Sequence, residues 1–289
     1  MAAPRVLVVD GNRAETRARQ LAAGGRASGE GYVETLQRLS PGIQCEIVRP
    51  ADGEVRWPSG VSLEQFDGAA ITGSALNVYD SGPHIERQIE LARAVFDSGL
   101  PFFGSCWGLQ IAVTVAGGLV RANPLGREFG IGRRIALTPA GRAHPMFSGK
   151  PDVFEAVTVH KDEIARLPPN AVELARNEMG LQAAEIRHGR GVFWGVQYHP
   201  EYSFTEIAAT ASRYGEALMG EQLFADLADM NNWIAEMRAL DMRAGDAAHA
   251  RRLAWRFGLG PSILQPGAKL AELRNWLEQR VAPFSRTRA

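Results

Sequence analysis

The stretch that most constrains the fold is a short apolar strand that turns into a helix at a cysteine. Residues 100–103 predict a buried strand, residues 109–115 predict the start of a helix, and Gly104 and Gly108 bracket Cys106 between them. Glycine allows a tight turn in which backbone segments approach without an intervening Cβ atom. A nucleophile type at such a turn is typical of a nucleophile elbow, for which G-x-S-x-G is the better known pattern. A helix N-terminus would favour the thiolate form of Cys106; the alternative is a small, buried, unreactive cysteine.

A second stretch predicts the partners that a cysteine nucleophile requires. Residues 191–197 form an apolar strand pattern that leads into His199-Pro200-Glu201. A nucleophile needs a base, and the base needs an orienting carboxylate. His199 and Glu201 are two residues apart, so on an extended backbone their side chains share one side. Pro200 keeps His199 out of a helix. Taken alone, His199 could simply end a strand, but the two stretches together favour a catalytic set.

These two stretches resemble the signatures of a known family. Gly104-Ser-Cys-Trp-Gly-Leu-Gln110 and Gly195-Val-Gln-Tyr-His-Pro-Glu201 are similar to the paired motifs of the class I (triad) glutamine amidotransferases. Arg127-Glu-Phe-Gly130 and His160-Lys-Asp162 further resemble the glutaminase domain of GMP synthase. The resemblance covers about residues 1–215. It implies that Cys106 is the nucleophile, His199 the base and Glu201 its orienter.

The same resemblance implies an oxyanion hole and a substrate-binding set. The backbone N–H groups of Gly73 and Trp107 would face the charge that develops on the attacked carbonyl oxygen. The chain has Ser74 and Ala75 where the family commonly has Gly and Pro, which leaves the N–H in place but makes the shape of the loop an open question.

Substrate contacts are implied at three further positions. Gln110 would help to bind the glutamine, and the segment carrying His160 and Asp162 would help to hold its amino and carboxylate groups. The plainer interpretations are a polar residue on the first turn of a helix for Gln110 and ordinary turn residues at a strand end for His160 and Asp162.

Composition limits the remaining function classes. The formal net charge is zero, so nothing global points to nucleic acid or membrane. The two cysteines, Cys45 and Cys106, form no disulfide framework and fit a reducing compartment. We see no signal-peptide pattern at the N-terminus and no apolar run near the ~20 residues that span a bilayer, so we expect a cytoplasmic protein. No metal-ligand spacing and no phosphate-binding loop occur, so we expect neither metal nor cofactor.

Alternating strand and helix patterns in the first half predict parallel strands joined by right-handed crossovers. We therefore expect a three-layer α/β/α sandwich with a mainly parallel central sheet and antiparallel strands in the second half. The site would lie at the carboxyl ends of the parallel strands. The predicted strands are residues 5–9, 43–48, 68–71, 100–103, 119–120, 131–137, 152–159, 171–175, 181–186 and 192–197. The predicted helices are residues 32–39, 83–98 and 109–115, while residues 12–31 are expected to form a loop or frayed helix.

The predicted catalytic domain spans residues 1–217, and residues 218–289 form a helical C-terminal extension. Residues 204–218 predict the helix that closes the domain, and residues 221–243, 247–257 and 268–281 predict three more. From residue 243 onward there are nine Lys and Arg residues against three Asp and Glu. This positive surplus predicts either a surface for an acidic partner or a solvated face.

The predicted reaction is hydrolysis of the glutamine side-chain amide to glutamate and ammonia through a γ-glutamyl thioester. The extension is too short for an ATP-using synthetase domain, so a separate synthetase or acceptor chain would use any transferred ammonia. Two alternatives remain: a γ-glutamyl peptidase or hydrolase of the same fold, and a non-catalytic regulatory or binding relative. We expect glutamine to be preferred over γ-glutamyl dipeptides.

Overall fold

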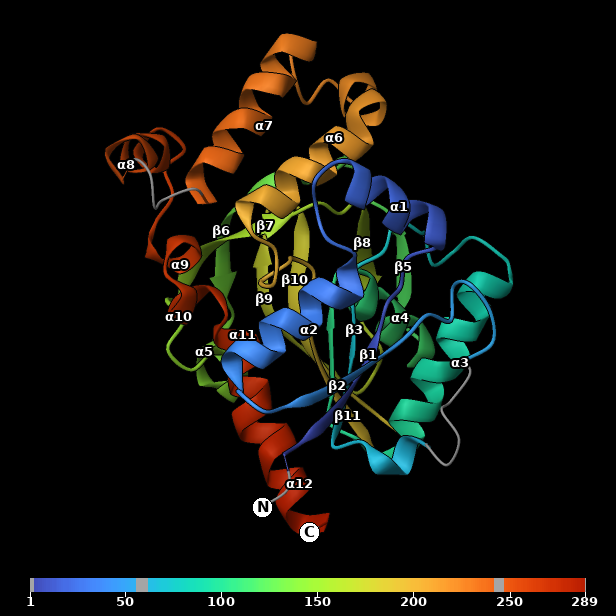
Figure 1. Ribbon diagram of the computed structural model, residues 1–289. Helices are drawn as coiled ribbons and strands as arrows, with labels where there is room; N and C mark the ends of the chain where they lie inside the picture. Colours follow the sequence, from blue (N-terminus) through green and yellow to red (C-terminus); the bar gives the residue numbers. More distant parts are fainter. Residues whose placement is uncertain (1–2, 56–61, 242–246, 289) are drawn as a thin grey trace.

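A computed structural model describes residues 3–55, 62–241 and 247–288, and its centre is a nine-stranded sheet (Figure 1). The strand order is β2-β1-β3-β4-β11-β10-β9-β6-β7. The first five strands of this order are parallel, namely β2 (Gln44–Val48), β1 (Arg5–Val9), β3 (Gly68–Ile71), β4 (Phe102–Ser105) and β11 (Gly191–Val196). The others pair antiparallel, namely β10 (Gly180–His188), β9 (Ala171–Asn177), β6 (Gly130–Leu137) and β7 (Val153–Thr158). The predicted fold class is confirmed.

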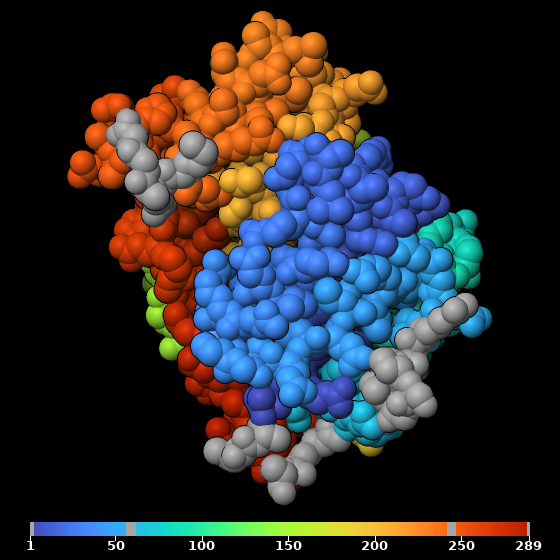
Figure 2. Space-filling model, in the orientation of Figure 1, coloured from blue at the N-terminus to red at the C-terminus, as the bar shows by residue number. Residues whose placement is uncertain are grey.

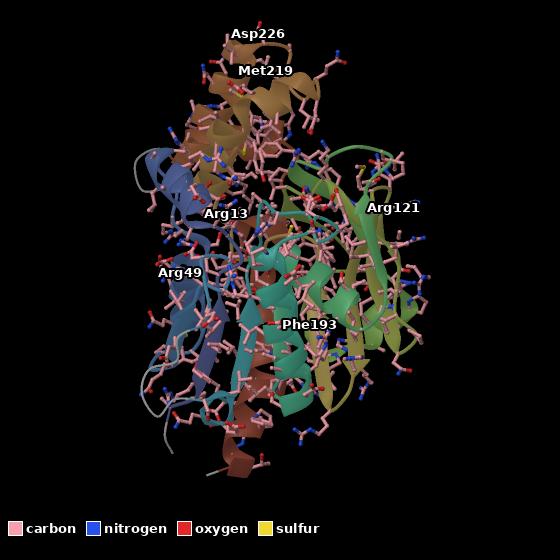
Figure 3. The ribbon with its side chains drawn as sticks, turned by 90° about the vertical axis from the view of Figure 1, so that its right-hand side faces the viewer. Arg13, Arg49, Arg121, Phe193, Met219 and Asp226 are labelled. Carbon is pink, nitrogen blue, oxygen red and sulfur yellow. The ribbon has the colours of Figure 1, made fainter. Side chains whose placement is uncertain are left out.

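Helices cover both faces of the parallel half of the sheet (Figure 1). One face carries α3 (Pro83–Ser98) and α4 (Trp107–Val115), and the other carries α2 (Ser28–Leu39) and the C-terminal α11 (Ala271–Trp276). Strand β1 shows the consequence, because Leu7 and Val9 enter the core beneath α3 and α4 while Val6 and Val8 enter the opposite core. Burial on both faces explains why the parallel strands have continuous apolar sequences. Phe193 of β11 lies in the first core, behind α3 in the side view (Figure 3).

The segment after β1 is helical, which corrects our expectation of a loop or frayed helix over residues 12–31. Helix α1 spans Ala14–Ala22, and α2 begins at Ser28 rather than at residue 32. The buried carboxylate of Asp10 accepts a hydrogen bond from the Gly29 N–H at 3.0 Å, which satisfies a free donor in the first turn of α2. This contact spans nineteen residues, so no local pattern announces it.

Three short elements and a small sheet complete the first two hundred residues. Strands β5 (Leu119–Ala122) and β8 (Asp162–Arg166) pair antiparallel in a separate two-stranded sheet, and β8 was not among the predicted strands. Helix α5 spans Pro139–Ala143, and 3₁₀ turns span Leu63–Gln65 and Pro145–Phe147.

The C-terminal region is helical, as predicted, but its helices are divided differently. The elements follow one another in this order: α6 (Phe204–Gly220), α7 (Leu227–Asp241), α8 (Ala247–Arg256), α9 (Pro261–Leu264), α10 (Pro266–Lys269), α11, a π turn at Leu277–Val281 and α12 (Ala282–Arg288). The single helix expected over residues 268–281 is therefore broken after Lys269. The helix expected over residues 221–243 begins only at Leu227; the predicted boundary at residues 217 and 218 falls within α6 and stays a prediction.

The residues after that boundary enter the cores of the molecule. Apolar residues of α7, α8 and α9 share a cluster with Phe204 and Ile207 of α6. Leu273 and Trp276 of α11 are fully buried against the sheet, and the Trp276 ring lies 5.7 Å from that of Phe103 in β4. In the space-filling view, orange and red C-terminal residues lie directly against blue N-terminal residues (Figure 2). Among the described residues no helix is long and apolar enough to cross a membrane.

This packing predicts a large loss of stability when Trp276 is replaced. Trp276→Ala should lower the free energy of unfolding by about 3–5 kcal/mol, because it removes a large ring from a packed core. Trp255 is a matched control in the same region, since it is 85% exposed, and Trp255→Ala should change the free energy by no more than about 0.5 kcal/mol. Urea unfolding monitored by circular dichroism measures both values. Equal small losses would show that the C-terminal segment does not support the sheet.

Candidate active site

The predicted elbow is present between β4 and α4. Cys106 has φ 51° and ψ −102°, a left-handed conformation that side-chain-bearing residues rarely adopt. Its N–H donates to the carbonyl oxygen of Val196 on β11 at 2.7 Å. A Cβ atom on Gly104 would lie 2.8 Å from the carbonyl carbon of Gly108, and one on Gly108 would lie 2.6 Å from the carbonyl oxygen of Ile71. Both glycines are therefore required by close backbone approach.

His199 and Glu201 form the hydrogen-bonded pair that their spacing predicts. The His199 Nδ1 lies 2.8 Å from the Glu201 Oε1, and both side chains are buried. The other carboxylate oxygen accepts a hydrogen bond from the Ser105 hydroxyl at 3.0 Å, and that hydroxyl is 2.8 Å from the Tyr32 hydroxyl. Ser105 and Tyr32 thus hold the carboxylate from its far side. Neither residue was predicted from the sequence, although Ser105 lies within the elbow motif.

The environment of His199 favours its protonated form. Burial alone would lower the pKa of this imidazole, but the Glu201 carboxylate and the nearby Cys106 side chain outweigh it and raise the pKa to about 10. The Nε2 atom, which faces away from Glu201, has no hydrogen-bond partner of good geometry in the described chain. This nitrogen is free to exchange a proton with a thiol or a leaving group. The Tyr202 ring stacks on the imidazole, with ring centroids 4.1 Å apart.

Gly73 lies against the His199 imidazole. A Cβ atom at this position would be 2.4 Å from the His199 Cε1. The Gly73 carbonyl oxygen accepts hydrogen bonds from the Asn12 Nδ2 at 3.1 Å and the Thr72 hydroxyl at 2.9 Å, so the Gly73–Ser74 peptide is held in one orientation. Trp107 begins α4, where first-turn N–H groups lack intrahelical acceptors. These positions suit an oxyanion hole, and that role stays a prediction.

The Asn12 side chain fixes the shape of the loop after β3, which contains Ser74 and Ala75. The Asn12 side chain donates to the Gly73 carbonyl and accepts from the Ala75 N–H at 3.1 Å, so it spans the turn. The Ser74 hydroxyl donates to the Gly11 carbonyl oxygen at 2.8 Å. The loop after β3 is therefore fastened to the loop after β1. Asn12 was not predicted from the sequence, because its partners lie more than sixty residues away.

The three expected substrate-binding residues lie in different settings. Gln110 is buried on the first turn of α4, where its N–H donates to the Cys106 carbonyl oxygen at 3.1 Å. His160 uses both ring nitrogens within the protein, with Nε2 2.8 Å from the Glu128 Oε2 and Nδ1 2.9 Å from the Asp162 carbonyl oxygen. The Tyr79 hydroxyl donates to the Asp162 carboxylate at 2.9 Å. Substrate binding by these residues stays a prediction, and any part played by His160 must act through its backbone or its neighbours.

Glu128 is a buried carboxylate with three hydrogen-bonded side-chain partners, and no role was predicted for it from the sequence. Besides His160, it accepts hydrogen bonds from Asn177 at 2.6 Å and Gln182 at 2.9 Å. Its only sequence signal is its place in the Arg127-Glu-Phe-Gly130 motif. Burial raises the pKa of the nearby Asp162 carboxyl, although the Tyr79 hydrogen bond opposes this effect. Within residues 3–55, 62–241 and 247–288, no group of three His, Cys, Asp or Glu side chains is arranged to hold a metal ion.

Comparison with known proteins places this site in a family. The model of the family described as glutamine amidotransferase class-I matches residues 31–212, a span that contains the elbow, His199 and Glu201. The chain belongs to the class I glutamine amidotransferase family.

The curated relatives differ in how much of the chain they match. A γ-glutamyl-L-1-hydroxyisopropylamide hydrolase from a Pseudomonas species is 35% identical over 286 residues, which is 98% of this chain and 95% of the relative. A glutamine-hydrolysing GMP synthase from Thermomicrobium roseum is 32% identical over 171 residues, which is 59% of this chain and 29% of that protein. A glutamine amidotransferase structure from Thermotoga maritima covers 97% of this chain with a TM-score of 0.63 at 18% identity, which supports the fold.

The contact between Gly73 and His199 predicts a severe loss of activity from one methyl group. Gly73→Ala would place a Cβ atom 2.4 Å from the imidazole, so the ring must move from its bonded position. We expect kcat/KM for amide hydrolysis to fall by about a hundredfold or more, as for an ångström-scale misplacement of a catalytic group. Gly31→Ala on α2 is the control, because a Cβ there meets no atom within 4 Å. Unchanged activity in Gly73→Ala would contradict the observed site geometry.

The Glu201 carboxylate should control both the rate and the protonation of His199. His199→Ala removes the predicted base and should reduce kcat by several orders of magnitude, whereas Glu201→Gln keeps the ring and should be milder. Because Glu201 opposes the effect of burial, Glu201→Gln should also lower the pKa of His199 from about 10. Nuclear magnetic resonance titration of the His199 ring measures that pKa. An unaltered pKa in Glu201→Gln would show that the carboxylate does not stabilise the imidazolium.

Proposed function

We propose that the protein hydrolyses γ-glutamyl amide bonds with Cys106 as the nucleophile, His199 as the proton carrier and Glu201 as its orienter. The observation that carries the proposal is the buried His199–Glu201 pair, 2.8 Å apart, beside the strained elbow cysteine. A backbone conformation of this kind costs about 1–3 kcal/mol and persists mainly at functional sites. A non-catalytic binding protein has no need of that strain beside an open imidazole nitrogen, so we set the regulatory alternative aside.

The proposed reaction proceeds in two halves. The Cys106 sulfur, its proton held by the His199 Nε2, attacks the γ-carbonyl carbon, and the N–H groups of Gly73 and Trp107 stabilise the oxyanion. The C–N bond then breaks, His199 gives its proton to the departing amine, and a γ-glutamyl thioester remains. His199 next accepts a proton from water, which attacks the thioester. Glutamate leaves, and the proton returns to the Cys106–His199 pair.

The substrate class follows from the extent of the relationships. The relative named as a γ-glutamyl-L-1-hydroxyisopropylamide hydrolase aligns over the C-terminal helices as well as the catalytic motifs. The alignment with GMP synthase omits about two fifths of this chain. We therefore favour a γ-glutamyl amide whose nitrogen carries a small organic substituent. This choice reverses our sequence-based expectation that glutamine is preferred.

Glutamine hydrolysis is the second candidate, and the elbow motif favours it. Enzymes that release ammonia from glutamine carry a motif similar to Gly104-Ser-Cys-Trp-Gly-Leu-Gln110. Glutamine and a γ-glutamyl amide would present the same γ-glutamyl group to Gln110. The two functions differ in the fate of the nitrogen that leaves the γ-glutamyl group. An amidotransferase needs a separate acceptor chain to use the ammonia, whereas a γ-glutamyl amide hydrolase releases its amine and requires no partner.

A substrate panel separates these candidates. We expect kcat/KM for a γ-glutamyl N-(2-hydroxyalkyl)amide to exceed that for glutamine by at least about tenfold, which corresponds to ~1.4 kcal/mol of transition-state binding. Amine release, ammonia release and glutamate formation are measured in parallel. Cys106→Ala should abolish all three, while Cys45→Ala, which alters a partly exposed cysteine outside the elbow, should abolish none. A tenfold preference for glutamine would restore the amidotransferase hypothesis.

A further inference from the structure

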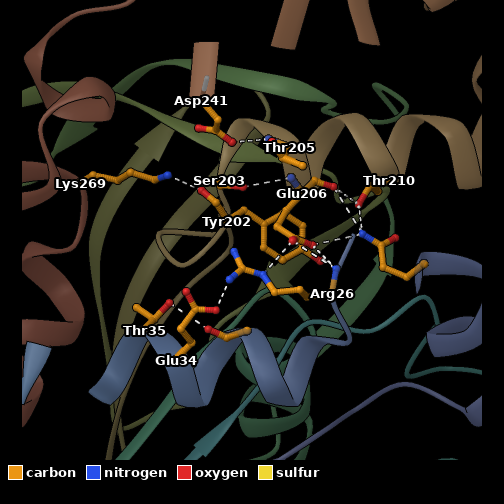
Figure 4. Close-up of polar contacts among 12 residues, drawn as sticks. Arg26, Glu34, Thr35, Tyr202, Ser203, Thr205, Glu206, Thr210, Asp241 and Lys269 are labelled. Carbon is orange, nitrogen blue, oxygen red and sulfur yellow. Dashed lines mark hydrogen bonds and ion pairs between the residues drawn. The ribbon is translucent and has the colours of Figure 1, made fainter. Parts of the chain in front are cut away.

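The turn that follows His199 and the start of α6 are held by two charged residues from the C-terminal region. Lys269, at the end of α10, donates a hydrogen bond from its Nζ to the carbonyl oxygen of Tyr202. Asp241, at the end of α7, accepts a hydrogen bond from the Thr205 N–H at 2.5 Å. Figure 4 shows both contacts, the Lys269 bond on the segment between β11 and α6 and the Asp241 bond on the first turn of α6. In both hydrogen bonds one partner is a charged side chain and the other a backbone group. Such charge-assisted bonds are stronger than bonds between neutral groups, so they hold the backbone firmly.

Lys269 and Asp241 form a clamp on this segment, and Tyr202 connects the clamp to the His199 imidazole. Its ring stacks on His199 with an interplanar angle of 25°, and its N–H donates to the His199 carbonyl oxygen at 3.3 Å. Residues on the strand side of His199 are held similarly, because the Tyr198 hydroxyl donates to Glu272 of α11 and Glu272 pairs with Lys150 at 2.8 Å. Any shift of α10 and α11 therefore displaces both neighbours of the imidazole.

We propose that Lys269 is a positioning residue, which sets the place of the His199 ring through the Tyr202 carbonyl and thereby makes the C-terminal segment part of the active site. The inference rests on the proposed role of His199 as the proton carrier. Lys269 itself touches neither the thiol nor the place where a substrate would bind in the proposed reaction. Its effect should fall on the rate of bond making at Cys106 rather than on substrate affinity.

The charge of Lys269 is as relevant as its hydrogen bond. Its ammonium group faces Asp241 of α7 and Glu201 of the triad, together with the cations Arg38 of α2 and Lys150. Burial is the largest influence and lowers the pKa of Lys269 to about 8, against the opposing pull of Asp241 and Glu201. The lysine is therefore charged below pH 8 and loses its charge above it, so the clamp should weaken across that range.

The test compares Lys269→Met, which keeps the aliphatic stem, with Lys269→Arg, which keeps the charge. Alkylation of Cys106 by iodoacetamide in a Cys45→Ala background reports the reactivity of the thiol without assuming any substrate. At pH 7 we expect Lys269→Met to lower the alkylation rate and kcat by about tenfold or more with KM nearly unchanged. Lys269→Arg should recover most of the loss.

Asn275→Ala controls for loss of stability alone. The Asn275 amide lies in the same C-terminal segment and donates to the carbonyl oxygens of Met146 and Ser148, each at 2.9 Å, with no hydrogen bond to the turn after His199. We expect Asn275→Ala to lower the Tm and to leave the alkylation rate and kcat near those of the wild type. If Asn275→Ala slows alkylation as much as Lys269→Met at a similar loss of Tm, the positioning role is overturned.

The pH dependence provides a second readout that a purely structural role would not produce. The ratio of the wild-type rate to the Lys269→Met rate should be largest below pH 8 and should shrink towards pH 9, because the wild type then loses its charge. The ratio of Lys269→Arg to Lys269→Met should stay constant, since arginine remains charged. Equal alkylation rates in wild type and Lys269→Met overturn the proposal. A wild type that is alkylated normally but hydrolyses no γ-glutamyl amide overturns the proposed function instead.

Discussion

The site depends on the strained backbone of Cys106. A non-glycine residue at φ 51° persists only where its surroundings leave no alternative. Here the N–H of Cys106 is held by Val196, while the contact of Gly104 with Gly108 closes the turn from strand to helix. The strand order brings the other parts of the site to the elbow. Because β4 lies between β3 and β11, the loop after β3, which carries Gly73, and the segment after β11, which carries His199, both lie next to the elbow and contact each other.

The elements that sequence patterns predicted well are those whose signals are local. Helix α3 runs from Pro83 to Ser98 as expected, because proline suits the first turn and Gly99, at φ 77°, ends the helix in a left-handed conformation. Strands β1 and β3 also match their predicted limits, since each is a short apolar run bounded by polar or glycine residues. The elbow and the His199–Glu201 pair were visible for the same reason: each is complete within a few consecutive residues.

The supports of the site were not predictable in this way, because they join distant parts of the chain. The Tyr32–Ser105 hydrogen bond spans 73 residues, and the Ser105–Glu201 bond spans 96. No periodicity links such positions before the chain has folded. The same limit explains the helix that we expected over residues 268–281. The apolar spacing there is helical, but the chain breaks after Lys269, which places that side chain on Tyr202 and the Glu272 side chain on Tyr198.

The charges buried in the C-terminal segment show what that segment contributes. Buried ion pairs such as Lys150–Glu272 are weak evidence for stability, because the loss of hydration offsets much of their attraction. An apolar pair would fill the same space at less cost. The charged side chains contribute defined positions instead, since Lys269 bonds to the Tyr202 carbonyl and Glu272 to the Tyr198 hydroxyl, on either side of His199 in the sequence. The turn that carries His199 is therefore held by side chains of its own chain. This arrangement is consistent with the proposed hydrolysis of γ-glutamyl amides, and the relative named for that activity aligns through the C-terminal helices.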